Sequence, residues 1–372
     1  MGAVMDAGDG VLAYPGGRTR PQARSVGFFE YWPDWVFYTP VVLAWAWLGL
    51  RYRGLTLMTA ANPRIPTGGL CGESKSGILD QIGGAARGFV APYATVRLEG
   101  PAATVLARAE AARVAAGLDY PVVVKPDIGC NGTGVRVARD RAALAAALPL
   151  YPAGIDLVIQ KLIADPGEAG LFYIRLPGEA SGRLTSVTLK YPPMVVGDGR
   201  STLQALILAD PRTRAQPRLY MRQVADRLTE VPASGETVQL VFVGNHCKGS
   251  TFIDGRDHVT PELTARIDEI ARSMPEFYFG RFDVRYGNLA ELRQGRGFSI
   301  IEVNGAGSEA THIWDPGTTL REAYRAQFHH YASAFRIGAA NRALGAKPTP
   351  LGELLRAWGT QRRLMGLYPG HD

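Results

Sequence analysis

The chain has 372 residues, more than one compact core usually holds, so we expect at least two domains or lobes. A composition that is 46% hydrophobic and 20% charged excludes a disordered protein. The net charge of +7 favours anionic partners, but no basic-aromatic motif stands out, so we expect no nucleic acid. Three cysteines without a C-x-x-C pair argue against a disulfide framework or a zinc site and favour a reducing, cytoplasmic setting.

The N-terminal part of the chain divides into a tail and an aromatic segment. Residues 1–24 are rich in Gly, Pro and Arg, and we interpret them as a flexible tail. Residues 25–66 form an aromatic amphipathic segment, in which the run 35–50 carries no charge. This run is shorter than the roughly 20 residues that cross a bilayer, and Pro40 would kink a helix there.

Two interpretations of the aromatic segment stay open. Trp and Tyr beside Arg51 and Arg53 are typical of a segment in the membrane interface. This interpretation predicts peripheral membrane contact through residues 28–53, at the inner face of the membrane. The alternative is a helix that packs on the core of the protein itself. A transmembrane span is less favoured, because the apolar run is too short.

The rest of the chain indicates a mixture of helices and strands. Residues 67–118 are expected to be a linker before the main domain at 119–335, and residues 336–372 a C-terminal extension. Hydrophobic periodicity predicts helices over 102–116, 142–148, 203–208, 261–273 and 320–335, and strands over 120–125, 157–163, 184–190, 280–286 and 298–303. A polar connection with glycine joins the last two strands, as in a hairpin.

A first chemical pattern is a strand that leads into a glycine-rich loop. Lys125 ends the strand, and Gly129, Gly132 and Gly134 follow it. Glycine lets backbone N–H groups approach phosphate oxygens, and a lysine adds a mobile positive charge. The spacing excludes a Walker A loop and a dinucleotide-binding fingerprint. The pattern predicts a phosphate-binding loop, with a plain glycine hairpin as the alternative.

A second pattern lies on the two strands of the expected hairpin. Residues two apart on a strand face the same side, so Arg281, Asp283 and Arg285 share one face, and Glu302 and Asn304 share another. If the strands pair, two carboxylates and an amide oxygen converge, and these are ligands that suit Mg²⁺. The alternative is a solvated, salt-bridged hairpin. The apolar neighbours of Glu302 favour the metal site, because a buried carboxylate needs a partner.

A third pattern is an apolar strand that ends in a polar loop, at residues 157–168. Backbone groups at 160–163 could bind an adenine edge, and Glu168 could accept ribose hydroxyls. This pattern alone is unspecific.

In this order, the three patterns resemble the ATP-grasp superfamily over roughly residues 68–331. The likeness is to D-alanine–D-alanine ligases and to the ATP-grasp domains of cyanophycin and glutathione synthetases. The Val-Val-Gly-Asp-Gly-Arg-Ser-Thr-Leu segment at 195–203 is similar to a segment of the cyanophycin and glutathione enzymes. The resemblance implies an α+β fold, in which two lobes with antiparallel sheets and flanking helices clamp ATP.

The resemblance also implies a set of nucleotide-binding residues. Lys75 and Lys125 would bind phosphates of ATP, Gly129, Gly132 and Gly134 would belong to the loop over them, Gln160, Lys161, Leu162 and Ile163 would hold the adenine, and Glu168 would hold the ribose.

Catalytic and metal roles follow from the same resemblance. Lys190 would contact the γ-phosphate side, and Arg281 would stabilise the negative charge of the transferred phosphoryl group. Asp283, Glu302 and Asn304 would hold two magnesium ions, or Mn²⁺ in their place.

The implied activity is ATP-dependent ligation of an amino-acid or peptide carboxylate to an amine through an acyl phosphate. The expected partners are therefore a small-molecule carboxylate and an amine, and a homodimer stays open. One alternative is a kinase-like phosphoryl transferase on the same fold. Another is a membrane-associated nucleotide-binding module without turnover.

The chain departs from the family at its start, where a Rossmann-like domain usually helps to bind the acceptor substrate. Three further features have two interpretations each. Cys130 is interpreted as a small loop residue and not as a nucleophile. His312 either contacts substrate or is structural, and the polar turn 245–250 either faces the acceptor pocket or is a plain loop.

Overall fold

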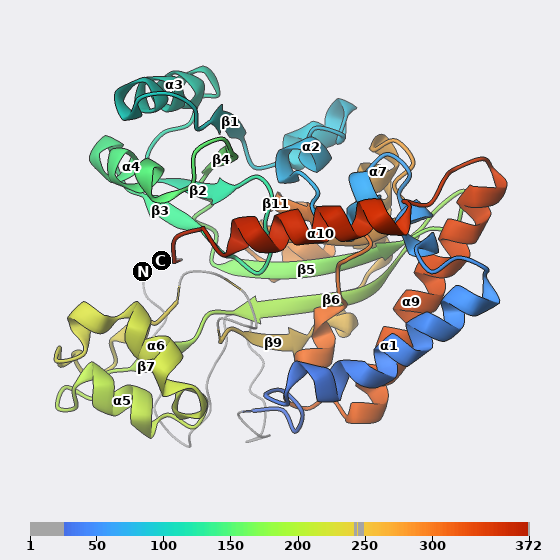
Figure 1. Ribbon diagram of the computed structural model, residues 1–372. Coiled ribbons are helices and arrows are strands. Elements are labelled where there is room, and N and C mark those ends of the chain that lie inside the picture. Colours follow the sequence, from blue (N-terminus) through green and yellow to red (C-terminus); the bar gives the residue numbers. More distant parts are fainter. Residues whose placement is uncertain (1–25, 242–243, 245–248, 371–372) are drawn as a thin grey trace.

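The computed structural model describes residues 26–241, 244 and 249–370, and two antiparallel sheets flanked by helices dominate it (Figure 1). The larger sheet lies at the centre of the view, and the smaller one lies above it at the left. The expected α+β architecture of antiparallel sheets with flanking helices is confirmed.

The small sheet has four strands and one helix-covered face. In spatial order its strands are β1 (Tyr93–Arg97), β4 (Asp156–Lys161), β2 (Val122–Pro126) and β3 (Arg136–Ala138), and its helices are α3 (Ala102–Ala115) and α4 (Arg141–Ala147). Val122 and Val124 alternate along β2 and are fully buried with Leu157 and Ile159 of β4. This alternation buries one face under α3 and α4 and leaves Lys125 free to face the other side.

The large sheet has five strands, and helices pack on both of its faces. Its strands in spatial order are β11 (Phe298–Asn304), β10 (Phe279–Tyr286), β5 (Gly167–Ile174), β6 (Arg183–Tyr191) and β9 (Thr251–Asp254). The helices that pack near it are α7 (Pro261–Ser273), α8 (Leu289–Arg293) and α9 (Leu320–Ala343). Leu171 and Tyr173 lie in the core with α7, whereas Phe172 and Ile174 lie in the core with α9. Both faces of β5 are therefore buried.

A third unit with its own small core lies below the large sheet, at the lower left of Figure 1. It contains the strand pair β7 (Met194–Val196) and β8 (Thr237–Gln239) and the helices α5 (Leu203–Ala209) and α6 (Pro217–Gln223). Thr202 caps α5 by accepting a hydrogen bond from the Ala205 N–H. The segment that resembles the cyanophycin and glutathione enzymes leads into this helix.

The aromatic N-terminal segment packs on the body of the protein along one face. Helix α1 (Asp34–Arg51) runs through Pro40, and its Phe37 stacks on Tyr324 of α9 with 5.3 Å between ring centroids. Trp45 contacts Phe335 further along the same pair of helices. The interpretation as a helix on the core holds for this face, while the opposite face of α1 is exposed.

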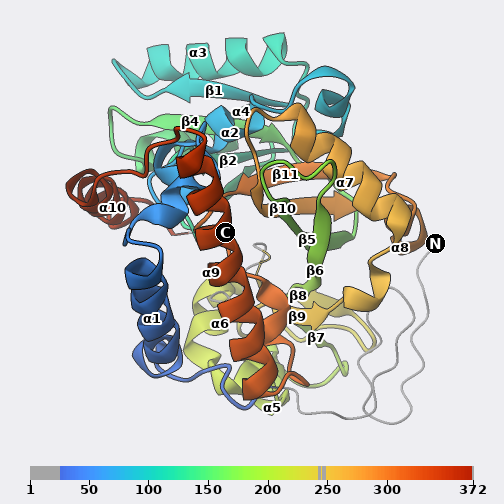
Figure 2. The ribbon, with the colours of Figure 1, turned by 90° about the vertical axis from the view of Figure 1, so that its right-hand side faces the viewer.

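Two further helices complete the described fold. The short helix α2 (Lys75–Leu79) lies between the sheets, and α10 (Leu351–Met365) crosses the front of the molecule in Figure 1. Figure 2 shows α1 and α10 on the same side, at the left of that view. Within the described part of the chain, we find no helix with both the length and the apolar character that a membrane span needs.

Most of the expected elements are present within a few residues of the predicted bounds. Strand β1 and helix α3 lie inside the range 67–118 and belong to the small sheet, and α9 continues past 335 to Ala343. The expected tail at 1–24 lies outside the described residues.

Candidate active site

A cavity of about 620 Å³ opens between the two sheets. The predicted site residues that line it are Lys125, Gly132, Gln160, Lys161, Leu162, Ile163, Glu168, Lys190, Arg281, Asp283, Glu302 and Asn304. The other three lie beside the cavity: Lys75 donates to Glu302 of its wall and to the Gly129 carbonyl, and Gly129 and Gly134 are the chain neighbours of the lining residues Cys130 and Val135. Segments from residue 75 to residue 304 therefore meet at one place.

Asp283 and Glu302 face each other across the β10–β11 pair. Arg281 donates two hydrogen bonds to the Asp283 carboxylate, at 2.8 and 2.9 Å, and the Lys190 ammonium lies 2.9 Å from it. Burial opposes ionisation, but Arg281 and Lys190 outweigh it and hold the pKa of Asp283 well below its usual range. Asp283 is therefore a permanent negative charge that positions two cations.

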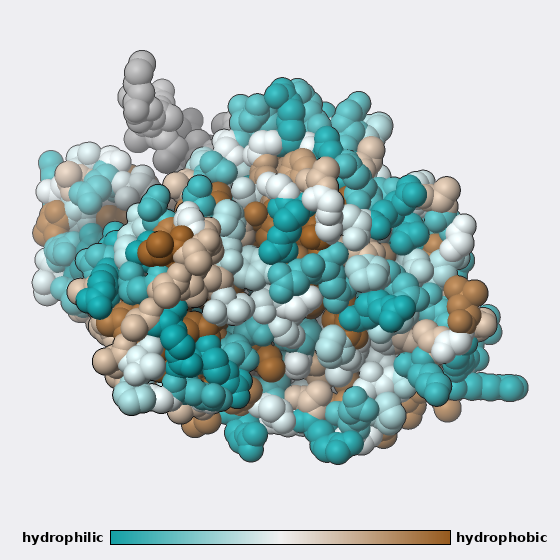
Figure 3. All heavy atoms as spheres, turned by 90° about the horizontal axis from the view of Figure 1, so that it is seen from above, coloured by the Kyte–Doolittle hydropathy of each residue, from teal (hydrophilic) through white to brown (hydrophobic). Residues whose placement is uncertain are grey.

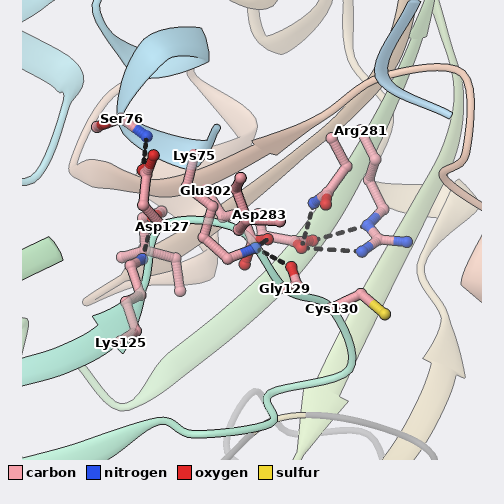
Figure 4. Close-up of polar contacts among 12 residues, drawn as sticks. Lys75, Ser76, Lys125, Asp127, Gly129, Cys130, Arg281, Asp283 and Glu302 are labelled. Carbon is pink, nitrogen blue, oxygen red and sulfur yellow. Dashed lines mark hydrogen bonds and ion pairs between the residues drawn. The ribbon is translucent and has the colours of Figure 1, made fainter. Parts of the chain in front are cut away.

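Glu302 is tied to Lys75, which also holds the glycine loop (Figure 4). The Lys75 Nζ donates to Glu302 Oε1 at 2.7 Å and to the Gly129 carbonyl at 2.6 Å. Lys75 itself is positioned because its backbone N–H donates to the carbonyl of Asp127, and the next N–H donates to the Asp127 carboxylate. Burial raises the pKa of Glu302, but Lys75 and Lys125 outweigh it, so the net shift is downward.

Lys125 lies at the end of β2 with two uncharged partners. Its Nζ donates to Gln160 Oε1 at 2.8 Å and to the Ile301 carbonyl at 3.0 Å. Burial lowers the pKa of Lys125 to about 8, although Glu302 acts in the opposite direction. An ammonium that is buried without a bound carboxylate gains from an anionic ligand, as the predicted phosphate role requires.

Glu168 extends the ion-pair network on the large sheet. Its carboxylate lies 3.2 Å from Lys190 and 3.5 Å from Arg285, and β5 places it opposite Lys190 on β6. Glu168 also lies within the cavity wall, where the predicted ribose role would place it.

The carboxylate and amide set fits a magnesium ion by its chemistry. Asp283, Glu302 and Asn304 come from two paired strands, and the Asn304 amide lies 3.1 Å from Asp283 Oδ2. Mg²⁺ needs few protein carboxylates when substrate phosphates complete its shell. Among the described residues there is no cluster of three or more His, Cys, Asp or Glu that could hold a metal, so this set depends on its amide and on the nucleotide.

The sequence analysis missed an aromatic wall of the cavity. Trp32 and Tyr38 from the N-terminal segment line the cavity together with Glu309 and Trp314. Tyr38 donates to Glu309 at 2.9 Å, Trp314 donates to it at 2.7 Å, and Gln327 donates to it as well. These contacts join residues far apart in the chain, and the only local signal was the aromatic richness of residues 28–38.

The C-terminal helix forms a second unexpected part of the site, because it covers the glycine loop. Tyr368 donates to the Ile128 carbonyl at 2.7 Å, and Gln361 accepts from the Gly72 N–H at 2.5 Å. Gly134 has φ +72°, and a Cβ there would meet Pro126 at 3.0 Å. The loop conformation therefore depends on glycine and on the packing of residues 361–368.

Other sequence predictions fall outside the cavity or outside the described residues. His312 is buried, lies 2.7 Å from Ser186 Oγ and does not line the cavity, so the structural role is favoured. Burial lowers the pKa of His312 to about 4. In the polar turn 245–250, residues 245–248 are not among the described residues.

One family model matches the chain over residues 91–151, and its description is "Carbamoyl-phosphate synthase L chain, ATP binding domain". This match, the two antiparallel sheets and the cationic cleft between them support the expected membership of the ATP-grasp superfamily.

Among curated proteins, the chain is similar to cyanophycin synthetases. It is 25% identical to those of Trichormus variabilis and Nostoc sp. over 210 residues, which cover 52% of this chain and 23% of each relative. The cyanophycin synthetase of Crocosphaera subtropica is 26% identical over 213 residues. The matched part of the chain thus spans less than a quarter of the length of these relatives.

The solved structures that match the chain include two ligases. The VanG D-Ala:D-Ser ligase from Enterococcus faecalis has a TM-score of 0.39 at 14% identity, covering 72% of this chain and 64% of that one. The D-alanine–D-alanine ligase from Bacillus anthracis has a TM-score of 0.38 at 15% identity, and the match covers 74% of this chain and 69% of that one.

Proposed function

We propose that this protein is an ATP-dependent ligase that joins the carboxylate of an amino acid or peptide to an amine through an acyl phosphate. The observation that carries this proposal is the convergence of Lys125, Lys190, Arg281, Asp283 and Glu302 on one cavity. Superfamily membership and the likeness to cyanophycin synthetases support it.

In this proposal the nucleotide contacts the small sheet, helix α2 and the start of strand β5. Lys125 and Lys75 bind phosphates, Gln160 to Ile163 hold the adenine, and Glu168 holds the ribose. Because Lys125 has only uncharged partners before binding, a phosphate oxygen satisfies its charge without displacing a carboxylate.

The large sheet performs the transfer chemistry. Asp283, Glu302 and Asn304 would hold Mg²⁺ or Mn²⁺, which neutralises phosphate charge when bound. Arg281, held in place by Asp283, and Lys190 stabilise the charge that develops as the substrate carboxylate attacks the γ-phosphate. The acyl phosphate then meets the amine, and the glycine loop with its C-terminal cover excludes water from the intermediate.

The aromatic wall favours an amine acceptor. The Glu309 carboxylate, beside Trp32 and Tyr38, accepts hydrogen bonds from three uncharged side chains, whereas the Arg281 guanidinium donates to the Glu309 backbone carbonyl at 3.0 Å. A cationic ammonium with an apolar body complements such a wall.

An ADP-release screen over amino acids, dipeptides and other carboxylates, with amines and Mg²⁺, tests the ligase activity. We expect substrate-dependent ADP and free phosphate with a new amide. Glu302→Gln should lower the rate at least about 100-fold, because it removes a charge that acts on the phosphates and frees Lys75. Glu262→Gln on the exposed first turn of α7 is the matched control.

Three outcomes contradict parts of this proposal. Phosphate retained on the acceptor would mean a kinase-like transferase in place of a ligase. Nucleotide binding without ADP release for any carboxylate would favour a module without turnover. Release that survives unchanged in Glu302→Gln would remove the metal assignment.

A further inference from the structure

Helix α1 carries a continuous apolar face that the fold leaves uncovered. Leu43, Trp47 and Leu50 are 66%, 59% and 76% exposed, and Trp35 and Val42 are exposed as well. At 100° per residue these five side chains fall within a stripe about 140° wide. The stripe lies opposite the face that packs on α9, so a helix that is apolar all round is buried on one side only.

Helix α10 carries a second exposed stripe of the same composition. Leu351, Leu355 and Trp358 follow the i, i+4, i+7 spacing of one helix face, and all three are exposed. The Arg362 guanidinium lies 4.8 Å from the Trp358 ring, just as Arg51 lies 5.9 Å from the Trp47 ring on α1. Each helix therefore presents a tryptophan with an arginine stacked on it.

Hydrogen bonds connect the segments that flank α1 and α10. Arg342, at the end of α9, donates to the carbonyls of Tyr52 and Arg53, which follow α1. The Thr349 N–H, just before α10, donates to Thr59. Figure 2 places α1 and α10 on the same side, at the left of that view. Seen from above, by contrast, hydrophobic residues form small patches between hydrophilic ones (Figure 3).

The charge on this side is strongly positive. Residues 34–55 and 342–363 contain seven basic residues and two acidic ones, Asp34 and Glu353. Trp and Leu beside Arg is the composition of helices that lie in the headgroup region of a membrane, where anionic lipids attract the basic residues. A second copy of the chain fits less well, because a two-fold interface would set this basic surface against itself.

We propose that α1 and α10 together bind the surface of a membrane that contains anionic phospholipids, with Trp47 and Trp358 inserted at headgroup depth. None of the exposed apolar side chains of the two stripes lines the cavity, so the proposal does not depend on the ligase activity. Vesicle binding needs no turnover, which keeps the two proposals distinguishable.

Co-sedimentation of the full chain with extruded vesicles tests the proposal. Wild-type protein should bind vesicles of phosphatidylglycerol and phosphatidylcholine at least about tenfold more tightly than phosphatidylcholine alone, and binding should weaken as salt rises. Leu43→Glu/Trp47→Glu and, separately, Trp358→Glu should each reduce binding at least about tenfold, because a charge opposes insertion. Val114→Glu, at an exposed apolar position on α3, should bind like the wild type.

A charge variant keeps the test decisive if the α1 double variant fails to fold. Arg356→Glu/Arg363→Glu changes two exposed side chains of α10 and should abolish the preference for anionic vesicles. Light scattering on the vesicle-free protein tests the alternative, in which a second copy of the chain covers the stripe. The proposal is overturned if wild-type protein binds neither vesicle type, if all variants bind like the wild type, or if the stripe instead closes a dimer that Trp47→Glu dissociates.

Discussion

Lys125 is a buried ammonium with two uncharged partners, and this gives nucleotide binding a pH dependence. Burial lowers the pKa of Lys125 to about 8, so without ligand the charge is present below pH 8 and is lost above it. A bound phosphate favours the charged form and raises this pKa. By linkage, the affinity for an anionic nucleotide should be level below about pH 8 and should fall as pH rises toward the usual lysine range.

Calorimetric titration with a non-hydrolysable ATP analogue between pH 7 and 9.5 measures this dependence. Lys125→Met should weaken binding about 10- to 100-fold at pH 7 and flatten the pH profile. Lys347→Met, an exposed lysine in the linker before α10, should behave like the wild type. An equally steep profile in Lys125→Met would assign the titration to another group.

At the scale of elements, the end of α10 and the residues that follow it pack over the glycine loop. Tyr368→Phe removes the hydrogen bond to the Ile128 carbonyl. The loss should lower the free energy of unfolding by about 0.5–1.5 kcal/mol and should mainly loosen the glycine loop. Because the loop excludes water, the variant should raise KM for ATP severalfold and increase phosphate release relative to amide formation. Parallel phosphate and amide assays measure this ratio, with Tyr52→Phe beyond α1 as the control. An unchanged ratio would mean that residues 361–368 pack on the loop without sealing it.

The elements also show why sequence reasoning reached some parts of the fold and not others. Strands β10 and β11 were predictable, because charged residues alternate with apolar ones on two neighbouring segments. Strand β5 was missed, since Gly167–Ile174 is buried on both faces and carries no alternation. Its Gly167 is required by the Tyr286 ring, which a Cβ would meet at 2.4 Å, a contact that no local pattern reveals.

At the scale of the molecule, the site joins residues that local motifs identify to residues that only tertiary packing brings in. Lys125 and its glycines, and the pair Asp283 and Glu302, could be found because their spacing follows strand and loop geometry. Glu309 and Tyr38 could not, because they are 271 residues apart and meet only when α1 packs beside α9. The aromatic wall that we propose for the acceptor is therefore the part that local motifs left undefined.

A nucleotide in this cavity would contact both sheets, and this predicts a ligand-linked gain in global stability. At 100 times its Kd, a ligand adds about 2.7 kcal/mol to the free energy of unfolding. For a chain of 372 residues this corresponds to about 3–4 °C in Tm. We expect such a shift from a non-hydrolysable ATP analogue with Mg²⁺, measured by thermal unfolding.

The magnesium-dependent part of that shift tests the metal assignment without turnover. Asn304→Ala removes one predicted oxygen ligand and leaves both carboxylates with their cations, so the analogue alone should still stabilise the protein while added Mg²⁺ contributes little. Gln294→Ala, exposed after α8, should keep the full shift. If Mg²⁺ stabilises Asn304→Ala as strongly as the wild type, the metal lies elsewhere, and Arg281 and the lysines alone balance the phosphate charge at this site.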